Sequence, residues 1–382
     1  MNPTAEFDLI VYGATGYTGR LVAEHLATRY GVGGEVTWAM AGRSAGKLAQ
    51  VRDEIGAPAD TPLVVADADD PAQLKAMVGR AKAIITTVGP YQLYGSDLVA
   101  ACAAAGTDYL DLSGEPNWMR AMIDAHGAAA QASGARILFS CGFDSIPFEL
   151  GVYFCQETAK AKLGGVVPRV KGRVRAMQGG LSGGTAASGA ATAAAIQKDR
   201  SQLAVLMSPF GLTPGFQGPA QPAGQAVEED PDVGPVGPFM MAIINTKNVH
   251  RSNLLMGHPY GTGFVYDEMV IGGAQGPGFT DLGSLPGGVP KPGEGPSQAE
   301  REAGFYDILF IGIAEDGRKV RVAVKGDMDP GYGSTSKMLA EAAICLIRAP
   351  DVAGGIWTPG AALQGRLVAR LAQHAGLSFE VE

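Results

Sequence analysis

The feature that most constrains this chain is a glycine-rich turn between a predicted strand and a predicted helix, close to the start of the sequence. Residues 7–19 read F-D-L-I-V-Y-G-A-T-G-Y-T-G. The apolar run before the glycines has strand propensity, and apolar side chains follow at helical spacing, at Leu21, Val22 and Leu26. A strand, a glycine turn and a helix in this order predict a dinucleotide-binding unit.

Each glycine of the turn has its own role in such a unit. Gly13 allows the tight turn off the strand, Gly16 lets the backbone approach a pyrophosphate, and Gly19 lets the helix pack close to the strand. The N–H groups of the helix start then face the phosphates. The glycine spacing is G-x-x-G-x-x-G rather than the usual G-x-G-x-x-G. The prediction of a dinucleotide site therefore depends on the strand and the helix that flank the glycines. The predicted cofactor-binding residues of the turn are Gly13, Ala14, Thr15, Gly16, Tyr17, Thr18 and Gly19.

The end of the second predicted strand, residues 36–41, indicates which dinucleotide binds. An Asp or Glu at this point would hold the ribose 2′-hydroxyl of NAD. The chain has Arg43 instead, followed by Ser44. Because a guanidinium pairs well with a 2′-phosphate, we predict NADP(H) rather than NAD(H), with Arg43 and Ser44 in its site.

Strands continue to alternate with helices through residues 1–144. The further strands are expected at residues 63–67, 83–88, 109–112 and 136–141. This spacing predicts an α/β fold, a Rossmann-type doubly wound parallel sheet with right-handed crossovers. Ligands bind beyond the carboxyl ends of such strands. Those ends carry the remaining predicted cofactor residues, Asp67, Gly89, Pro90 and Tyr91.

The pattern changes after residue 144. Residues 145–330 are expected to form a second, α+β domain with a mostly antiparallel sheet, whose strands lie at 167–177, 242–253, 263–271 and in a hairpin over 306–325. The Pro- and Gly-rich stretches 209–238 and 272–296 are expected to be long loops. Residues 331–382 return to helix and are expected to pack back on the first domain. An exposed sheet in the second domain would favour a homodimer.

Composition excludes several classes of partner. The net charge of −8 argues against nucleic acid and anionic membrane surfaces. No apolar stretch reads as a transmembrane helix, and the opening residues lack the basic residues of a signal peptide. The four cysteines lie in apolar runs without C-x-x-C spacing. They are expected to be buried free thiols in a reducing cytoplasm, where we place the protein.

No sequence pattern indicates a metal site or covalent catalysis, because the five histidines are scattered and neither H-E-x-x-H nor G-x-S-x-G is present. A hydride-transfer enzyme needs only a positioned nicotinamide, a proton donor and donors for developing negative charge. Tyr91 and Tyr94 follow the fourth strand, and Thr185 opens an alanine-rich helix whose N-terminus can hold an oxyanion. These three are the predicted catalytic residues. The alternative for Tyr91 and Tyr94 is that their rings only pack within the fold. The alternative for Thr185 is that it lies in an ordinary strand-to-helix turn without a catalytic role.

Acidic residues after the fifth and sixth strands are expected to be structural. Asp111 and Glu115 flank Ser113 and Gly114, and they are expected to cap the next helix rather than act as acid or base. Asp144 and Ser145 are expected to cap the helix that follows them.

Six motifs lie along the chain: G-A-T-G-Y-T-G (13–19), A-G-R-S (41–44), V-G-P-Y-Q-L-Y-G (88–95), A-A-G-T-D-Y-L-D-L-S-G-E (104–115), C-G-F-D-S-I-P (141–147) and D-P-G-Y-G-S-T-S-K-M (329–338). Together they resemble the saccharopine dehydrogenase-like oxidoreductases, in particular the trans-acting enoyl reductase subgroup. The likeness spans nearly the whole chain and is poorest at the two Pro- and Gly-rich stretches. The resemblance implies a Rossmann domain for NADP(H) and a second domain that carries the substrate and a subunit interface.

The resemblance also implies an activity. A trans-acting enoyl reductase would reduce a carbon–carbon double bond of an acyl chain, held on a carrier protein or in a small thioester. A saccharopine reductase would instead reduce an imine, and its carboxylate-rich substrate would need basic residues such as Arg173, Arg175, Lys247 and Arg251. A non-catalytic NADP(H)-binding sensor or interaction protein is the third reading, because no clear acid–base pair stands out.

Overall fold

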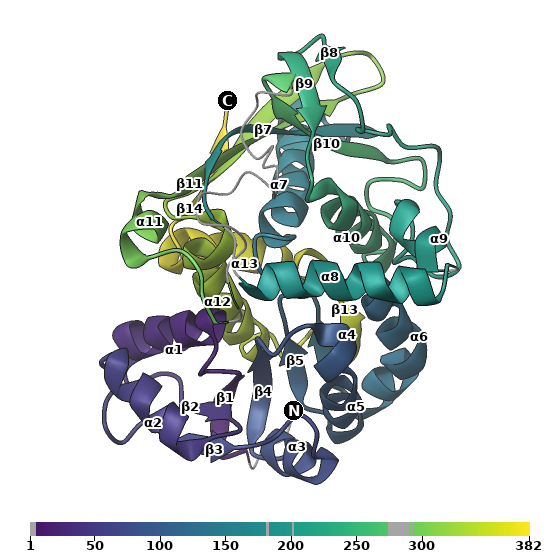
Figure 1. Cartoon of the computed structure of the whole chain (residues 1–382). Helices are drawn as coiled ribbons and strands as arrows, with labels where there is room; N and C mark the ends of the chain where they lie inside the picture. The colour runs from purple at the N-terminus through teal and green to yellow at the C-terminus, as the bar shows by residue number, and fades with distance from the viewer. Residues whose placement is uncertain (1–4, 181–182, 201, 274–290, 292) are drawn as a thin grey trace.

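The computed structural model describes residues 5–180, 183–200, 202–273, 291 and 293–382. Two seven-stranded sheets organise these residues, one above the other in Figure 1, with helices between and around them. The predicted α/β class is confirmed, since the first sheet is wholly parallel and the second is mixed and mostly antiparallel.

The first sheet has the strand order β13-β6-β5-β4-β1-β2-β3. Its strands are β1 (Phe7–Tyr12), β2 (Trp38–Gly42), β3 (Leu63–Val65), β4 (Ala81–Thr86), β5 (Asp108–Leu110), β6 (Arg136–Leu138) and β13 (Gly355–Trp357). The six strands expected in residues 1–144 are present. Strand β13 was not predicted; it comes from the far end of the chain and pairs with β6.

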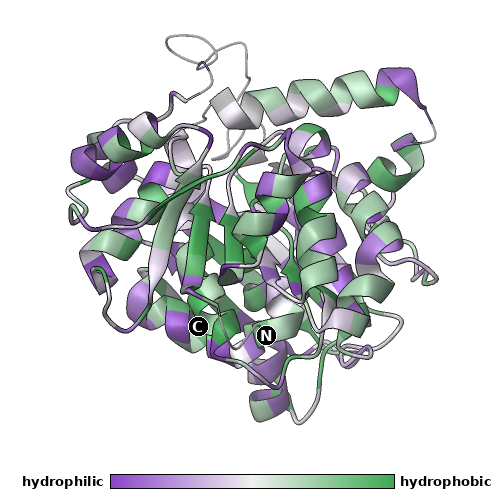
Figure 2. Ribbon diagram, turned by 90° about the horizontal axis from the view of Figure 1, so that it is seen from below, coloured by the Kyte–Doolittle hydropathy of each residue, from purple (hydrophilic) through white to green (hydrophobic). Residues whose placement is uncertain are grey.

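Helices cover both faces of this sheet, which explains its continuous apolar strands. Leu9 and Val11 of β1 belong to one core cluster, and Ile10 and Tyr12 belong to the cluster on the opposite face. The helices in this part are α1 (Tyr17–Tyr30), α2 (Ala45–Glu54), α3 (Pro71–Val78), α4 (Tyr91–Tyr94), α5 (Ser96–Ala105) and α6 (Pro116–Ser133). Figure 2 shows the hydrophobic strands in the middle of the molecule, with hydrophilic turns of the helices outside them.

The second sheet has the strand order β14-β12-β11-β7-β10-β9-β8. Its strands are β7 (Arg169–Gln178), β8 (Glu228–Asp230), β9 (Gly234–Pro238), β10 (Val265–Ile271), β11 (Phe305–Ile313), β12 (Lys319–Gly326) and β14 (Leu377–Val381). Only the β7–β10 pair is parallel. The expected hairpin is β11–β12, and the last strand, β14, was not predicted.

Two sequence-based expectations for the second sheet are wrong. Residues 242–253 do not form a strand; they lie in helix α10 (Ala242–Leu255). The buried polar side chains of this helix find partners on other elements. Asn248, for example, donates to Ser145 Oγ at 2.9 Å. Residues 228–238, expected in a loop, contain the β8–β9 hairpin, whereas residues 274–290 of the second expected loop lie outside the described residues.

The remaining helices connect the two sheets. They are α7 (Ile146–Leu163), α8 (Gly183–Lys198), α9 (Gln202–Met207), α11 (Gln298–Ala303), α12 (Thr335–Ile347) and α13 (Pro359–His374). Helix α12 packs against α1, where His25 Nε2 lies 2.8 Å from Glu341 Oε1. Helix α8 crosses the front of the molecule between the two sheets (Figure 1). The four cysteines are buried free thiols, as predicted. None of the described helices is long and apolar enough to cross a membrane.

Candidate active site

The carboxyl ends of the parallel strands bring the sequence motifs to one edge of the first sheet. We call this the carboxyl edge and define it by residues 13–19, 89–91, 113–115 and 142–145. Strand β1 has β2 on one side and β4 on the other, so the strand order changes direction at the glycine turn. Such a switch point is where open α/β sheets bind ligands.

The glycine turn has the backbone that a dinucleotide needs. Gly13 adopts a φ of +89°, a conformation that side chains other than glycine rarely adopt. The N–H groups of Gly13 and Ala14 donate to the carbonyl of Ala41, at 3.0 and 3.1 Å, and this fixes the turn on β2. Gly16 is the N-cap of α1, and no described side chain caps this helix. The first N–H groups of α1 are therefore available to an anion.

Gly16 and Gly19 differ in the space that a side chain would find, and the space at Gly16 fits a pyrophosphate. A Cβ atom on Gly19 would lie 2.6 Å from Thr87 Oγ1 and would overlap the carbonyl of Gly13. Gly19 therefore serves the packing of α1 on β1. A Cβ on Gly16 would meet only the Gly13 carbonyl oxygen, at 3.3 Å, and Gly16 is exposed. The fold thus leaves room in front of Gly16, where a phosphate can approach the backbone.

The side chain of Tyr17 has a role that the sequence did not reveal. Its hydroxyl donates to the carbonyl of Pro296 and accepts from Arg301 Nη1, and its ring packs edge-on against Tyr332. Tyr17 therefore joins the start of α1 to segments from the second half of the chain. Its hydroxyl is therefore bonded within the fold, and the neighbouring Thr15 and Thr18 are half-buried.

The residues predicted to bind the adenosine half of the cofactor, Arg43, Ser44 and Asp67, follow β2 and β3. Arg43 is exposed and forms no ion pair with any residue that the structure describes. The hydroxyl of Ser44 caps α2 by accepting from Lys47 N at 3.4 Å. Burial raises the pKa of Tyr12 to about 12, with Asp67 adding to the shift and Arg43 opposing it. Because β2 and β3 pair in parallel, Arg43 and Asp67 follow their strands at the same end of the sheet.

The two tyrosines after β4 have different surroundings. The Tyr91 hydroxyl donates to the Thr86 carbonyl and accepts from Leu112 N, both at 3.2 Å, and its ring stacks on Trp118. Burial raises the Tyr91 pKa well above its usual value. Its hydroxyl is therefore occupied within the fold. The side chain of Tyr94 is 42% exposed, so its hydroxyl is the one available for chemistry.

Glu115 caps a helix, but not the one expected. Its carboxylate accepts from the N–H groups of Tyr91 and Gln92, at 3.0 and 2.9 Å, and so caps α4 instead of α6. The same carboxylate accepts from Ser188 of α8 at 2.8 Å. Glu115 thus connects the carboxyl edge to the helix that crosses it.

Asp111 is a buried structural carboxyl. It accepts from the N–H groups of Ser113 and Ser140, at 2.9 and 3.1 Å, and from the Tyr109 hydroxyl at 2.8 Å. Burial raises its pKa to about 7 despite these hydrogen bonds. Asp111 therefore fixes the loops after β5 and β6 to each other; it does not cap the next helix.

Asp144 is the functional candidate that sequence reasoning missed. It was expected to cap α7 with Ser145, but no side chain caps that helix among the described residues, and Ser145 Oγ accepts from Asn248 instead. Asp144 is half-buried beside Gly114, where a Cβ would lie 2.9 Å from Asp144 Oδ2. No other residue that the structure describes forms a hydrogen bond or ion pair with its carboxyl group. Burial raises its pKa to about 7, opposed by its own backbone N–H.

Thr185 lies in the first turn of α8, but its side chain is outside the described residues. The helix itself lies over the carboxyl edge, because Ser188 contacts Glu115 and Gln92 Nε2 donates to Thr192 Oγ1 at 3.2 Å. Thr185 remains a predicted oxyanion residue.

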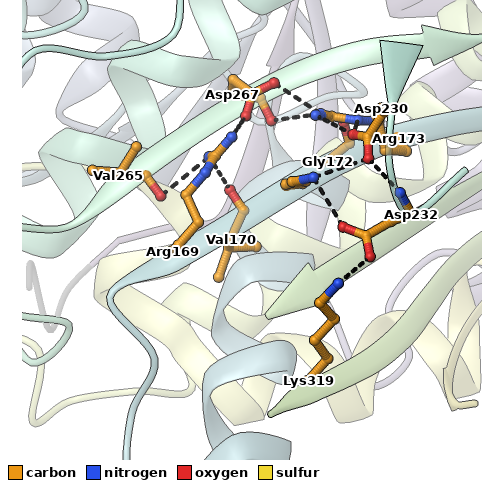
Figure 3. Close-up of polar contacts among 10 residues, drawn as sticks. Arg169, Val170, Gly172, Arg173, Asp230, Asp232, Val265, Asp267 and Lys319 are labelled. Carbon is orange, nitrogen blue, oxygen red and sulfur yellow. Dashed lines mark hydrogen bonds and ion pairs between the residues drawn. The ribbon is translucent and has the colours of Figure 1, made fainter. Parts of the chain in front are cut away.

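The basic residues considered for a carboxylate-rich substrate do not gather at the carboxyl edge. Arg173 pairs with Asp230 and Asp267 at 2.9 Å, in a network that also includes Arg169, Asp232 and Lys319 (Figure 3). Lys171 joins this network by pairing with Asp230 and Asp232. Arg175 pairs with Asp307. Arg251 is buried and donates to the carbonyls of Leu212 and Ile356. Lys247, on α10, donates to the carbonyl of Ile243, and like Arg251 it has no carboxylate partner among the described residues.

Comparisons with known proteins agree with this geometry. The family model of the saccharopine dehydrogenase NADP-binding domain matches residues 9–138. A Mycobacterium tuberculosis protein provisionally named a trans-acting enoyl reductase is 40% identical, over 98% of this chain and 97% of its own. The trans-acting enoyl reductase of Mycobacterium leprae is 36% identical over 96% of each chain. Saccharopine dehydrogenase (L-Glu forming) of Saccharomyces cerevisiae aligns over 98% of this chain and 100% of its own, with a TM-score of 0.57 and 10% identity, which shows a shared fold.

Proposed function

The chain belongs to the saccharopine dehydrogenase-like oxidoreductases, as its motifs predicted, and from this premise we propose that it is a trans-acting enoyl reductase. It is an NADP-dependent oxidoreductase. The proposed substrate is an α,β-unsaturated acyl thioester, held on a carrier protein or on coenzyme A. The observation that supports the proposal is the half-buried Asp144 carboxyl beside Gly114, at the carboxyl edge.

The cofactor site is proposed from the residues of the carboxyl edge. The N–H groups at the start of α1 hold the pyrophosphate, and Gly16 leaves the space for it. Arg43 pairs with the 2′-phosphate, on the same side as Asp67. The strand ends after β4, at Gly89 and Pro90, then lie beside the nicotinamide half. Bound NADPH supplies the hydride that reduces the β-carbon.

The chain supplies a proton and a polar environment for the rest of the reaction. Negative charge develops on the thioester oxygen as the β-carbon is reduced, and the N-terminus of α8 with Thr185 is the proposed donor. Asp144 is the proposed acid that protonates the α-carbon. A carboxyl with a pKa near 7 is protonated in a large fraction of molecules at neutral pH, and it recovers its proton from solvent after each turnover.

The experiment that tests the function is an assay of NADPH oxidation with crotonyl and longer 2-enoyl thioesters, on coenzyme A and on a phosphopantetheine carrier. We expect the saturated thioester as product, with one NADPH consumed for each double bond. Tight NADPH binding without turnover of any enoyl thioester would support the sensor alternative instead. Turnover with imines alone would support a saccharopine reductase.

The first mutational prediction concerns Arg43. We expect Arg43→Ala to weaken NADPH binding by about 1.5–3 kcal/mol, the scale of a hydrogen bond to a charged group, and to leave NADH binding nearly unchanged. The reason is that only NADPH carries the 2′-phosphate. Calorimetric titration with both cofactors measures the difference. Arg80→Ala is the matched control, because Arg80 lies at the opposite end of β1, where it pairs with Glu6. Equal losses for NADPH and NADH would contradict the assignment.

The second mutational prediction separates the oxyanion donor from the tyrosine. We expect Thr185→Val to raise the activation barrier by about 2.7 kcal/mol, the lower end for loss of one such donor, and to leave NADPH affinity intact. Thr192→Val on the same helix is the control, since its hydroxyl is bonded to Gln92. Tyr94→Phe is expected to lower kcat only if the exposed hydroxyl donates to the substrate. An unchanged kcat in Thr185→Val would remove Thr185 from the mechanism.

We also propose a separate role for each of three parts of the chain. Residues 1–144 bind NADP(H), residues 145–330 carry the substrate and a homodimer contact, and residues 331–382 pack back on the first domain. The packing of α12 on α1 supports the last assignment, although β14 joins the second sheet. The buried free cysteines support a location in the reducing cytoplasm. The proposed acyl thioester substrate supports a role in lipid metabolism. Light scattering of the purified chain tests the dimer.

A further inference from the structure

A cavity of about 560 Å³ is lined by residues from the second half of the chain. It is enclosed by α9, residues 221–225, the start of α10 and strand β10. None of the residues that define the carboxyl edge lines it. Its volume falls within the range of about 300–1,000 Å³ that is typical of small-molecule sites.

The inner wall of the cavity holds a cation without a counter-charge. Lys247 is only 2% exposed, and its Nζ donates to the carbonyl of Ile243, one turn back on its own helix, at 2.7 Å. An ammonium group has three donors, so two of them have no partner among the residues that the structure describes. Burial lowers the pKa of Lys247 to about 8, which leaves it mostly charged at neutral pH. A buried unpaired charge is costly unless a ligand compensates it.

Two acidic residues, Asp267 and Glu268, also line the cavity, and neither forms an ion pair with Lys247. Asp267 pairs with Arg169 and Arg173. Glu268 accepts from the Tyr266 hydroxyl and from Asn245 Nδ2, both at 2.9 Å, and it forms no ion pair with Lys247. Burial raises the pKa of Glu268 to about 8, so this carboxyl is mostly neutral at neutral pH. Asn245 Oδ1 is buried without a hydrogen-bond partner among the described residues. The inner wall is thus polar, and its Lys247 ammonium has no carboxylate partner among the described residues.

The mouth of the cavity is apolar. Met207 of α9 is 57% exposed, and Ile243 of α10 is 44% exposed. Met240 is exposed beside them, and Pro222 and Ala223 complete the rim. A polar, cationic inner wall behind an apolar mouth matches a ligand with an anionic head and a hydrocarbon tail.

We infer that this cavity is a second ligand site, which binds a long-chain carboxylate with its head group on Lys247 and its tail along Met207, Met240 and Ile243. The site does not depend on the proposed reduction, because it shares no lining residue with the carboxyl edge. A ligand here contacts α9 and α10, and α10 also bonds to Ser145 through Asn248.

Calorimetric titration with dodecanoate, in the presence of saturating NADPH, tests this site. We expect one dodecanoate to bind per chain without displacing NADPH. Lys247→Met keeps the length of the side chain and is expected to weaken dodecanoate binding at least tenfold. Lys162→Met, an exposed lysine of α7, is the control and is expected to bind like the original chain.

A second variant keeps the test valid if Lys247→Met fails to fold. Ile243→Asp places a negative charge at the exposed mouth, and it is also expected to weaken dodecanoate binding at least tenfold. Dodecan-1-ol, which lacks the carboxylate, should bind the original chain and Lys247→Met alike. Equal dodecanoate affinity in the original chain and both variants, displacement of NADPH by dodecanoate, or no heat of binding would overturn the proposal.

Discussion

Gly16→Val is expected to abolish NADPH binding while the chain still folds. The added side chain would occupy the space in front of the α1 N-terminus. We expect the fold to tolerate it, because the Gly13 carbonyl oxygen, at 3.3 Å, is the only described atom beyond the two chain neighbours that lies within 4 Å of a Cβ at Gly16. The pyrophosphate would then lose its contacts with the first N–H groups of α1. Two charged hydrogen bonds of about 1.5–3 kcal/mol each correspond to a loss in affinity of at least about 100-fold. Calorimetry with NADPH measures this loss.

Two other glycines provide the controls for Gly16→Val. Gly19→Val should destabilise the fold itself, because its Cβ would overlap the Gly13 carbonyl and crowd Thr87. Gly127→Val, in α6, should change neither folding nor binding, because no atom lies within 4 Å of a Cβ there. If Gly16→Val bound NADPH with unchanged affinity, the phosphates would have to lie elsewhere. If the melting temperature of Gly16→Val fell as far as that of Gly19→Val, Gly16 would be needed for folding. Gly16→Ala, with its smaller side chain, would then be used to test NADPH binding.

Asp144→Asn is expected to lower kcat by about 10²–10⁴-fold, the usual contribution of a general acid, and to leave NADPH affinity unchanged. The amide cannot deliver a proton to the α-carbon, whereas the half-buried carboxyl can. The change should appear in kcat more than in KM, because the proton moves only after the substrate is bound. Steady-state assays with a 2-enoyl thioester measure both constants. Asp316→Asn, in the exposed β11–β12 turn, is the matched control.

The pH profile separates an acid role for Asp144 from a purely structural one. Its pKa is raised to about 7, so the protonated, active form is present below pH 7 and is lost as the pH rises through 7. We expect kcat to fall on the alkaline side of about pH 7 in the original chain, and Asp144→Asn to lose this limb. Asp111 has a similar pKa but holds the loops after β5 and β6, so Asp111→Asn should lower the melting temperature. An alkaline limb that persisted in Asp144→Asn would exclude Asp144 as the acid.

The sequence predicted correctly those elements whose structure depends only on residues a few positions apart. The glycine turn predicted β1 and α1, because strand propensity, a φ of +89° at Gly13 and helical spacing act within a few residues. Asp70 and Pro71 predicted the start of α3, and Asp70 accepts from Ala72 N and Gln73 N as expected. Residues 242–253 show the limit of this approach. Their polar side chains are stable in a helix only because distant residues, such as Ser145 and Glu268, provide partners.

The same limit applies to the candidate site. The sequence placed Glu115 and Asp144 at strand ends, but which helix a carboxylate caps depends on loops that meet only in the folded sheet. Tyr91 and Tyr94 read alike in the sequence, yet one hydroxyl bridges Thr86 and Leu112 while the other ring is exposed.

By itself, the sequence therefore determined the Rossmann unit, the preference for NADP(H) and the family, because glycines, strand ends and motifs are encoded in consecutive residues. Only the tertiary structure decided which titratable groups are buried without a charged partner. The Asp144 carboxyl and the Lys247 ammonium owe their shifted pKa values to burial among elements far apart in the chain. Burial is a property of the packed molecule and not of any segment. The sequence could therefore name Asp144 as a helix cap and Lys247 as one of several basic residues, but it could not show that either is buried without a charged partner.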